Sequence, residues 1–209
     1  MEQFFFNYDL RPNFSIHDYF VGKSNIEAYN LLINNKNNNN IFLIGPPKSG
    51  KTHLALIWQK KFNALTYDNN IKKILENTSN VIIDNIFNNI NEEDIFHIIN
   101  HCSSINCNIL ITSNMNLNEY TFQLKDLSSR LKTFININID LPDDELLVNL
   151  MTKLFHDKQI IVKNPEIFHY IIKRVHRSYE KIFDLIDKID NLLMKKNKQL
   201  TIPLIKELI

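Results

Sequence analysis

The sequence predicts an α/β domain built on a parallel five-stranded sheet, followed by a small all-helical domain. Short apolar runs at residues 41–44, 64–67, 81–83, 109–112 and 134–139 have the length and composition of buried strands. Segments with helical spacing of apolar residues alternate with these runs, as in parallel sheets that are covered on both faces. After Leu141 and Pro142 only helical patterns follow, so we expect the division between the two parts near residue 141.

The second part carries its own helix boundaries. Asp143 is placed to cap a helix, Asn164-Pro165 opens a second one, and Ser178 is placed to cap a third. Each is followed by apolar residues at three- and four-residue spacing, the pattern of an amphipathic helix. The sequence therefore predicts a tail over residues 1–13, an α/β domain over 14–141 and a helical domain over 142–209.

Composition limits the functional classes. The chain has 209 residues, is 44% hydrophobic and carries a formal net charge of +1, so it lacks the strong positive charge of a dedicated DNA-binding domain. No run is long and apolar enough to span a bilayer, and Glu2 stands where a signal peptide would carry lysines. We expect a cytoplasmic protein with no membrane association and no direct sequence-specific DNA binding.

Two cysteines, Cys102 and Cys107, lie beside His101. A metal site would need a fourth ligand and a tighter spacing, so free thiols that are buried or half-buried are the preferred interpretation.

The strongest motif is Gly45-Pro46-Pro47-Lys48-Ser49-Gly50-Lys51-Thr52, which fits the phosphate-loop pattern G-x-x-x-x-G-K-[ST] at every fixed position. The glycines let backbone N–H groups turn toward phosphates, and the following helix, which includes His53, presents the positive end of its dipole. We expect Lys51 to reach the β- and γ-phosphates and Thr52 to give its hydroxyl to Mg²⁺. The alternative is a chance match in a tight turn, but a strand precedes the motif and a helix follows it.

A second acidic group is expected at the end of a neighbouring strand. Asp84 follows the run at 81–83 and is predicted to hold Mg²⁺ with Thr52; the alternative is a solvated turn residue. The next residue is Asn85, whose amide cannot accept the proton of an attacking water. The sequence therefore predicts binding of ADP or ATP with weak or no intrinsic hydrolysis.

With these motifs placed, the chain resembles the AAA+ ATPases of the DnaA family, and most closely the shorter regulatory members of the Hda type. The resemblance runs nearly end to end. The runs that carry it are F-S-I-H-D-Y-F-V-G-K-S-N at 14–25, G-K-T-H-L at 50–54, I-D-N-I at 83–86, I-T-S-N at 111–114, L-S-S-R-L at 127–131 and L-T-I-P-L-I-K-E-L at 200–208. The resemblance implies an AAA+ nucleotide-binding domain followed by a helical lid.

The same resemblance implies roles for further residues. Val21 and Asn25 would border the adenine, Asn114 would monitor the γ-phosphate, and Arg130 would be an arginine finger acting on a neighbour's nucleotide; the alternative for Arg130 is an exposed or helix-capping arginine. Glu180 stands where the family has an arginine that contacts phosphate from the lid, and Arg177 or Lys181, a turn to either side, could substitute. The chain has no helix-turn-helix domain after Ile209, so we expect no origin recognition.

The N-terminal run Gln3-Phe4-Phe5-Phe6 resembles the short peptide with which Hda and other replication proteins bind the DNA polymerase sliding clamp. Gln3, Phe4 and Phe6 would enter the clamp pocket; the alternative is an apolar tail that packs on its own domain. The leading hypothesis is a regulator that binds the clamp and promotes hydrolysis of ATP held by the initiator DnaA. Alternatives are an initiator paralogue or helicase loader, and a small-molecule P-loop kinase. Homodimer formation is left open.

Overall fold

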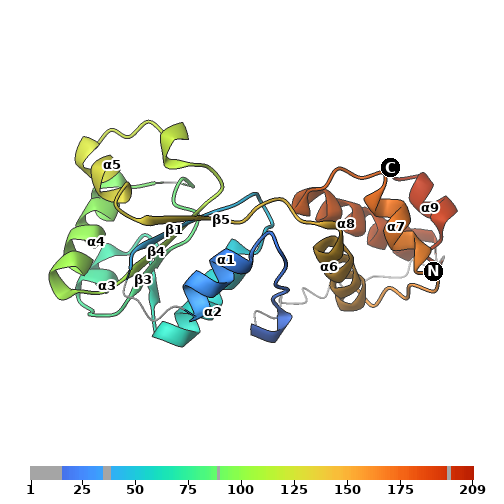
Figure 1. Ribbon diagram of the computed structural model, residues 1–209, viewed down its shortest axis with the longest axis horizontal. Coiled ribbons are helices and arrows are strands. Elements are labelled where there is room, and N and C mark those ends of the chain that lie inside the picture. Colours follow the sequence, from blue (N-terminus) through green and yellow to red (C-terminus); the bar gives the residue numbers. More distant parts are fainter. Residues whose placement is uncertain (1–15, 35–38, 89, 197–198) are drawn as a thin grey trace, which may run out of the picture.

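The computed structural model describes residues 16–34, 39–88, 90–196 and 199–209 (Figure 1). An α/β part occupies one side of the molecule and a helical part the other, and the described chain passes from the first to the second after the last strand. Within the described ranges, no helix has both the length and the apolar character needed to cross a membrane.

The described part of the chain forms a five-stranded sheet in which every pair of neighbouring strands is parallel, as predicted. The strands are β1 (Ile41–Ile44), β2 (Leu65–Thr66), β3 (Val81–Ile83), β4 (Ile109–Ser113) and β5 (Ile135–Asn138), and their order is β2-β3-β4-β1-β5. β2 and β5 are shorter than the apolar runs that predicted them. The carboxyl ends of β1 and β4 lie side by side, with Ile44 opposite Ser113.

Helices cover both faces of this sheet (Figure 1). The leading segment before β1 contains η1 (Ile16–Asp18), α1 (Ile26–Tyr29) and η2 (Asn30–Asn34). The helices between the strands are α2 (Lys51–Phe62), α3 (Ile71–Leu75), α4 (Glu92–Ile105), η3 (Leu117–Glu119) and α5 (Lys125–Leu131). Alternate side chains of one strand enter opposite cores: Leu43 packs in the core formed with α1 and α2, whereas Phe42 packs in the core formed with α3, α4 and α5. Both cysteines are free, Cys102 buried and Cys107 partly so, as expected.

After β5 the described chain contains helices only: α6 (Asp144–Asp157), α7 (Glu166–Ile172), α8 (Tyr179–Lys196) and α9 (Ile202–Lys206). The Asp143 carboxylate accepts the backbone N–H of Leu146 at 2.8 Å, which is the predicted cap of α6. These helices share a separate apolar core, and Lys158 ties the end of α6 to α8 through Asp187 and Asp190 at 3.0 and 2.9 Å.

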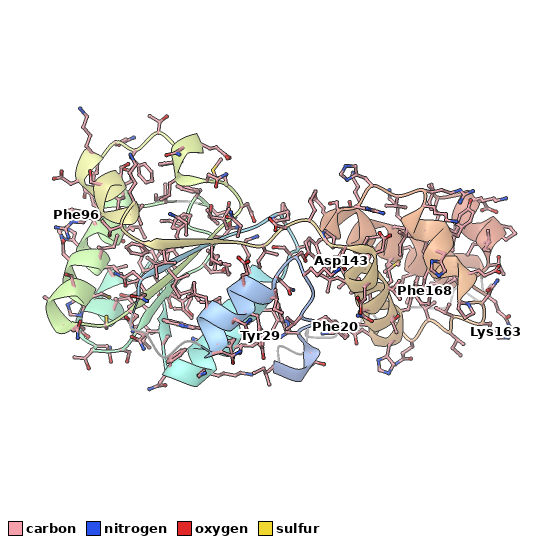
Figure 2. The ribbon with its side chains drawn as sticks, in the orientation of Figure 1. Phe20, Tyr29, Phe96, Asp143, Lys163 and Phe168 are labelled. Atoms are coloured by element: carbon pink, nitrogen blue, oxygen red, sulfur yellow. The ribbon has the colours of Figure 1, made fainter. Side chains whose placement is uncertain are left out.

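The segment before α1 connects the two parts. The Ser24 carbonyl accepts the N–H of Asp140, and the Ser24 hydroxyl lies 3.1 Å from the Tyr179 hydroxyl at the start of α8. Nearby, the Lys153 ammonium of α6 donates to the Asp18 carbonyl at 2.9 Å. Phe20 and Asp143 mark this strip between the sheet and the helical part in Figure 2. The contacts hold α6, through Lys153, and the first turn of α8, through Tyr179, against the segment before α1.

Candidate functional site

A loop of fixed geometry joins β1 to α2. Gly50 adopts a left-handed backbone, with φ of 89°, and a Cβ there would come within 3.0 Å of the Tyr19 ring. A Cβ on Gly45 would come within 2.9 Å of the Ser49 hydroxyl and 3.0 Å of Ile139. Space and backbone geometry therefore require glycine at both positions, which is the backbone demand that the motif predicted.

Lys51 lies at the base of this loop with only 7% of its surface exposed. Its ammonium donates to the carbonyl oxygens of Gly45 and Pro46 at 2.8 and 2.9 Å. Burial lowers the pKa of Lys51 to about 8, and the nearby Asp84 carboxylate opposes that fall only in part. The loop therefore holds a cation that the protein alone solvates poorly.

Asp84 lies directly after β3 and accepts two hydroxyl donors. Thr52, in the first turn of α2, donates to one carboxylate oxygen at 2.9 Å, and Thr112, near the end of β4, donates to the other at 2.5 Å. Thr52 and Asp84 thus bring a hydroxyl and a carboxylate oxygen together, the ligand type that Mg²⁺ prefers. The described residues include no cluster of three or more His, Cys, Asp or Glu suited to a metal, so an ion here would take further ligands from phosphates and water.

Asn85 follows Asp84 in a left-handed conformation, with φ of 55°. Its backbone N–H donates to the Thr112 hydroxyl at 2.7 Å, which completes a chain from Asn85 through Thr112 to Asp84. Asn85 lines the same cavity as Asp84. The structure therefore puts an amide, which is no proton acceptor, at the position next to the acidic residue.

These groups line a cavity of about 500 Å³, a size typical of small-molecule sites. One wall comes from the leading segment and the sheet end, and includes the predicted residues Asn25, Pro47, Lys48, Ser49, Gly50, Lys51, Thr52, His53, Asp84 and Asn114. The opposite wall comes from α6 and α8, through Leu146, Leu150, Lys153, Leu154, Asp157, Tyr179 and Phe183.

Four residues predicted to bind the nucleotide lie outside that lining: Gly45, Pro46, Val21 and Arg177. Val21 is 43% exposed and lines a smaller separate groove. Arg177 is exposed and forms an ion pair with Asp144 at 3.0 Å, which holds its guanidinium away from the cavity. Glu180, at the place of the family's lid arginine, is exposed as well. The lid position that faces the cavity one turn further along α8 is Phe183.

Arg130 lies far from this cavity. It is exposed on α5, and its guanidinium carbon lies 5.2 Å from the centre of the Phe96 ring on α4. Figure 2 shows Phe96 at the end of the α/β part opposite to the helical part. The predicted clamp-binding residues Gln3, Phe4 and Phe6 lie outside the described residues.

Sequence reasoning missed the residues that complete the cavity. Thr112 is fully buried and donates a hydrogen bond to Asp84. Its position could have been inferred from the sequence, because it is a polar residue near the carboxyl end of β4, the strand adjacent to β3. Tyr19 stacks on Tyr29 at 6.0 Å and meets His53 edge-on at 5.3 Å, which packs the leading segment against the start of α2. The residues of α6 and α8 that line the cavity, here called the lid wall, could not be singled out from the sequence. They belong to the apolar stripe that any amphipathic helix carries.

Both the helical part and the overall fold are similar to known proteins. Residues 148–209 match the family described as "Hda, lid domain". Domain III of the Thermotoga maritima replication initiation protein DnaA superposes with a TM-score of 0.77 at 16% identity, over 94% of this chain and 95% of that one.

Two further solved structures share the fold. AMPPCP-bound DnaA from Aquifex aeolicus gives a TM-score of 0.64 at 19% identity over 87% of this chain, which spans 66% of that relative. The Thermotoga maritima RuvB Holliday junction branch migration motor gives 0.65 at 15% identity, over 90% of this chain and 68% of that one. No curated protein sequence matches the chain. The chain therefore has the fold of DnaA domain III, and its residues 148–209 match the Hda lid-domain family.

Proposed function

We propose that this protein is a regulator of chromosomal replication initiation. It binds ADP or ATP with Mg²⁺ in the cavity between the sheet and the lid, and it presents Arg130 to a nucleotide held by the replication initiator DnaA. It binds the DNA polymerase sliding clamp through its N-terminal tail.

Nucleotide binding is supported by the groups that converge on the cavity. Lys51 is a buried cation whose two carbonyl partners do not neutralise its charge, so phosphate oxygens would stabilise it. Thr52 and Asp84 would hold Mg²⁺, which supplies positive charge next to the phosphates. The Aquifex aeolicus relative contains AMPPCP, an adenine nucleotide analogue.

The observation that carries the regulatory proposal is the position of Arg130. An exposed arginine at the end of the domain opposite to the lid is remote from the protein's own cavity, and the described lining of that cavity contains no arginine. Such a side chain can neutralise phosphoryl charge only on a neighbouring molecule. An arginine supplied across an interface accelerates hydrolysis by about 10³-fold or more.

The clamp contact is proposed for Gln3, Phe4 and Phe6. Aromatic anchors carry most of the binding energy in short-peptide interfaces, so removal of residues 1–7 should abolish clamp affinity in surface plasmon resonance while the domain stays folded. Equal affinity with and without the tail would place the clamp contact elsewhere.

The test is an assay of ATP hydrolysis by the initiator, with clamp, DNA and this protein added in turn. Arg130→Ala should abolish the clamp-dependent stimulation but leave nucleotide and clamp binding intact, and Arg130→Lys should rescue poorly because it lacks the planar guanidinium. Arg174→Ala is the matched control, because Arg174 is also exposed and lies over a ring, that of Tyr170, at 3.9 Å in the lid.

Two results would contradict the proposal at different levels. If Arg130→Ala stimulates as well as the wild type, Arg130 is not the finger. If the wild-type protein gives no stimulation with clamp and DNA present, the regulatory function itself is wrong. Nucleotide binding is tested separately by calorimetry with Lys51→Ala, which should lose ADP affinity.

A further inference from the structure

Lys48 is an unusual residue for the backbone position that it occupies. It lies in the phosphate loop with φ of 63°, a left-handed conformation that lysine adopts rarely. At the other left-handed non-glycine positions that the structure describes, the chain uses mostly asparagine, the residue that tolerates this conformation best: Asn63, Asn69, Asn85, Asn106 and Gln159. Asparagine or glycine would satisfy the backbone at position 48 with less strain, so the lysine side chain needs a reason of its own.

The side chain of Lys48 lines the cavity from the loop side. Its ammonium lies 5.6 Å from the centre of the Phe183 ring on α8, a distance typical of a cation held over an aromatic face. The ring leaves the N–H donors of the ammonium without a hydrogen-bond acceptor among the described residues. Lys48 thus reaches from the phosphate loop to the lid without donating a hydrogen bond to any residue that the structure describes.

The other two lysines in the described lining are arranged differently. Lys51 donates to the carbonyl oxygens of Gly45 and Pro46, and Lys153 donates to that of Asp18. Lys48 is therefore the lysine of this lining that remains available to an anionic ligand.

We propose that Lys48 is a second phosphate-binding cation of this site and that Phe183 holds its ammonium in place from the lid. The inference rests on the proposed binding of nucleotide. It supplies from the loop a positive charge that α8 does not bring to the cavity, because the residues of α8 in the described lining are Tyr179 and Phe183. Lys48 also links the phosphates to the lid, because its ammonium would contact phosphate oxygens and the Phe183 ring together. Bound phosphate would therefore restrain α8.

The test uses Lys48→Asn, which keeps a residue suited to the left-handed backbone and removes the charge. In calorimetry its affinity for AMPPCP should fall about tenfold, or ~1.4 kcal/mol, and Lys48→Arg should keep most of the wild-type affinity. The loss should shrink at high salt, because screening weakens the contribution of a charge. The free energy of unfolding without nucleotide should be unchanged or higher, which separates a binding role from a structural one.

Lys72→Asn is the matched control, because Lys72 is exposed on α3 and lies outside the cavity lining. AMPPCP affinity within about twofold of wild type for Lys48→Asn would overturn the phosphate role. Failure of the proposed function looks different: the wild type would bind no nucleotide, or Lys51→Ala would bind as well as wild type.

A double-mutant cycle with Phe183→Leu tests whether the Phe183 ring holds the Lys48 ammonium in place. Leucine keeps an apolar side chain and removes the ring. If Phe183 positions the ammonium, the loss caused by Lys48→Asn should be smaller in the Phe183→Leu background than in the wild type. Additive losses would show that Phe183 does not position Lys48, and would overturn the link between the phosphates and the lid.

Discussion

Replacement of Lys51 by methionine should stabilise the protein near neutral pH while it abolishes nucleotide binding. The fall in the pKa of Lys51 from its usual 10.5 to about 8 means that burial of the charged form costs ~3 kcal/mol. Methionine removes that cost, but it also removes the donor for the carbonyl oxygens of Gly45 and Pro46, worth about 1 kcal/mol each. The net gain in the free energy of unfolding should be about 1 kcal/mol.

The sign of this difference should reverse with pH. Between about pH 8 and 10.5 the unfolded chain keeps the Lys51 proton and the folded chain releases it, so the wild type gains stability as pH rises. The methionine variant has no such gain, and above this range it should be the less stable protein by ~2 kcal/mol. Urea unfolding of both proteins without nucleotide, from about pH 7 to 10, measures the difference directly.

Comparison of the two proteins isolates Lys51 from other groups. Burial raises the pKa of Tyr19 and Cys102, which lowers stability at high pH, but this contribution is common to both proteins and cancels. Lys72→Met, at an exposed lysine on α3 outside the cavity lining, is the control for loss of a lysine side chain. A difference between Lys51→Met and wild type that stays constant over this range would refute the assignment of a costly buried charge.

Three further outcomes follow from the described contacts. Thr112→Val removes the hydroxyl between Asn85 and Asp84 and leaves both groups without that partner, so urea unfolding should show a loss of about 1–3 kcal/mol. ATP turnover by the purified protein should be slow, and Asn85→Asp should raise it in a phosphate-release assay; unchanged turnover would mean that more than a proton acceptor is missing. Tyr179→Phe removes the hydroxyl that meets Ser24 and should cost about 1 kcal/mol of stability, with a matching loss of nucleotide affinity if that contact holds the lid wall in place.

The sheet and the phosphate loop could be predicted because their signals are local. An apolar run of four residues between turn residues is enough to indicate a buried strand, and the two glycines of the loop are required by backbone geometry that Gly45 and Gly50 show directly. The oxygen pair Thr52 and Asp84 followed from topology, because parallel strands end at the same edge of a sheet.

The lid wall of the cavity could not be predicted, because contacts distant in sequence determine it. The Ser24–Tyr179 and Asp18–Lys153 hydrogen bonds join residues more than a hundred positions apart and decide which face of α6 and α8 meets the phosphate loop. Arg177 illustrates the same limit. Its position in the sequence suited a phosphate contact, but an exposed arginine pairs with the nearest carboxylate, and packing of α6 put Asp144 there.

The left-handed turns of this chain have a consequence for how its relatives can be found. The protein contains only 3 glycines, and asparagine occupies left-handed positions such as the residues that follow α2 and α4, Asn63 and Asn106. Glycine and asparagine both suit that backbone, so drift in base composition can exchange one for the other without moving the chain. Such an exchange lowers the sequence identity between two proteins but leaves their backbones superposable. It is one way in which a TM-score of 0.77 can accompany 16% identity. In genomes poor in guanine and cytosine, profiles that treat the two residues as equivalent at turns should recover AAA+ proteins that identity searches overlook.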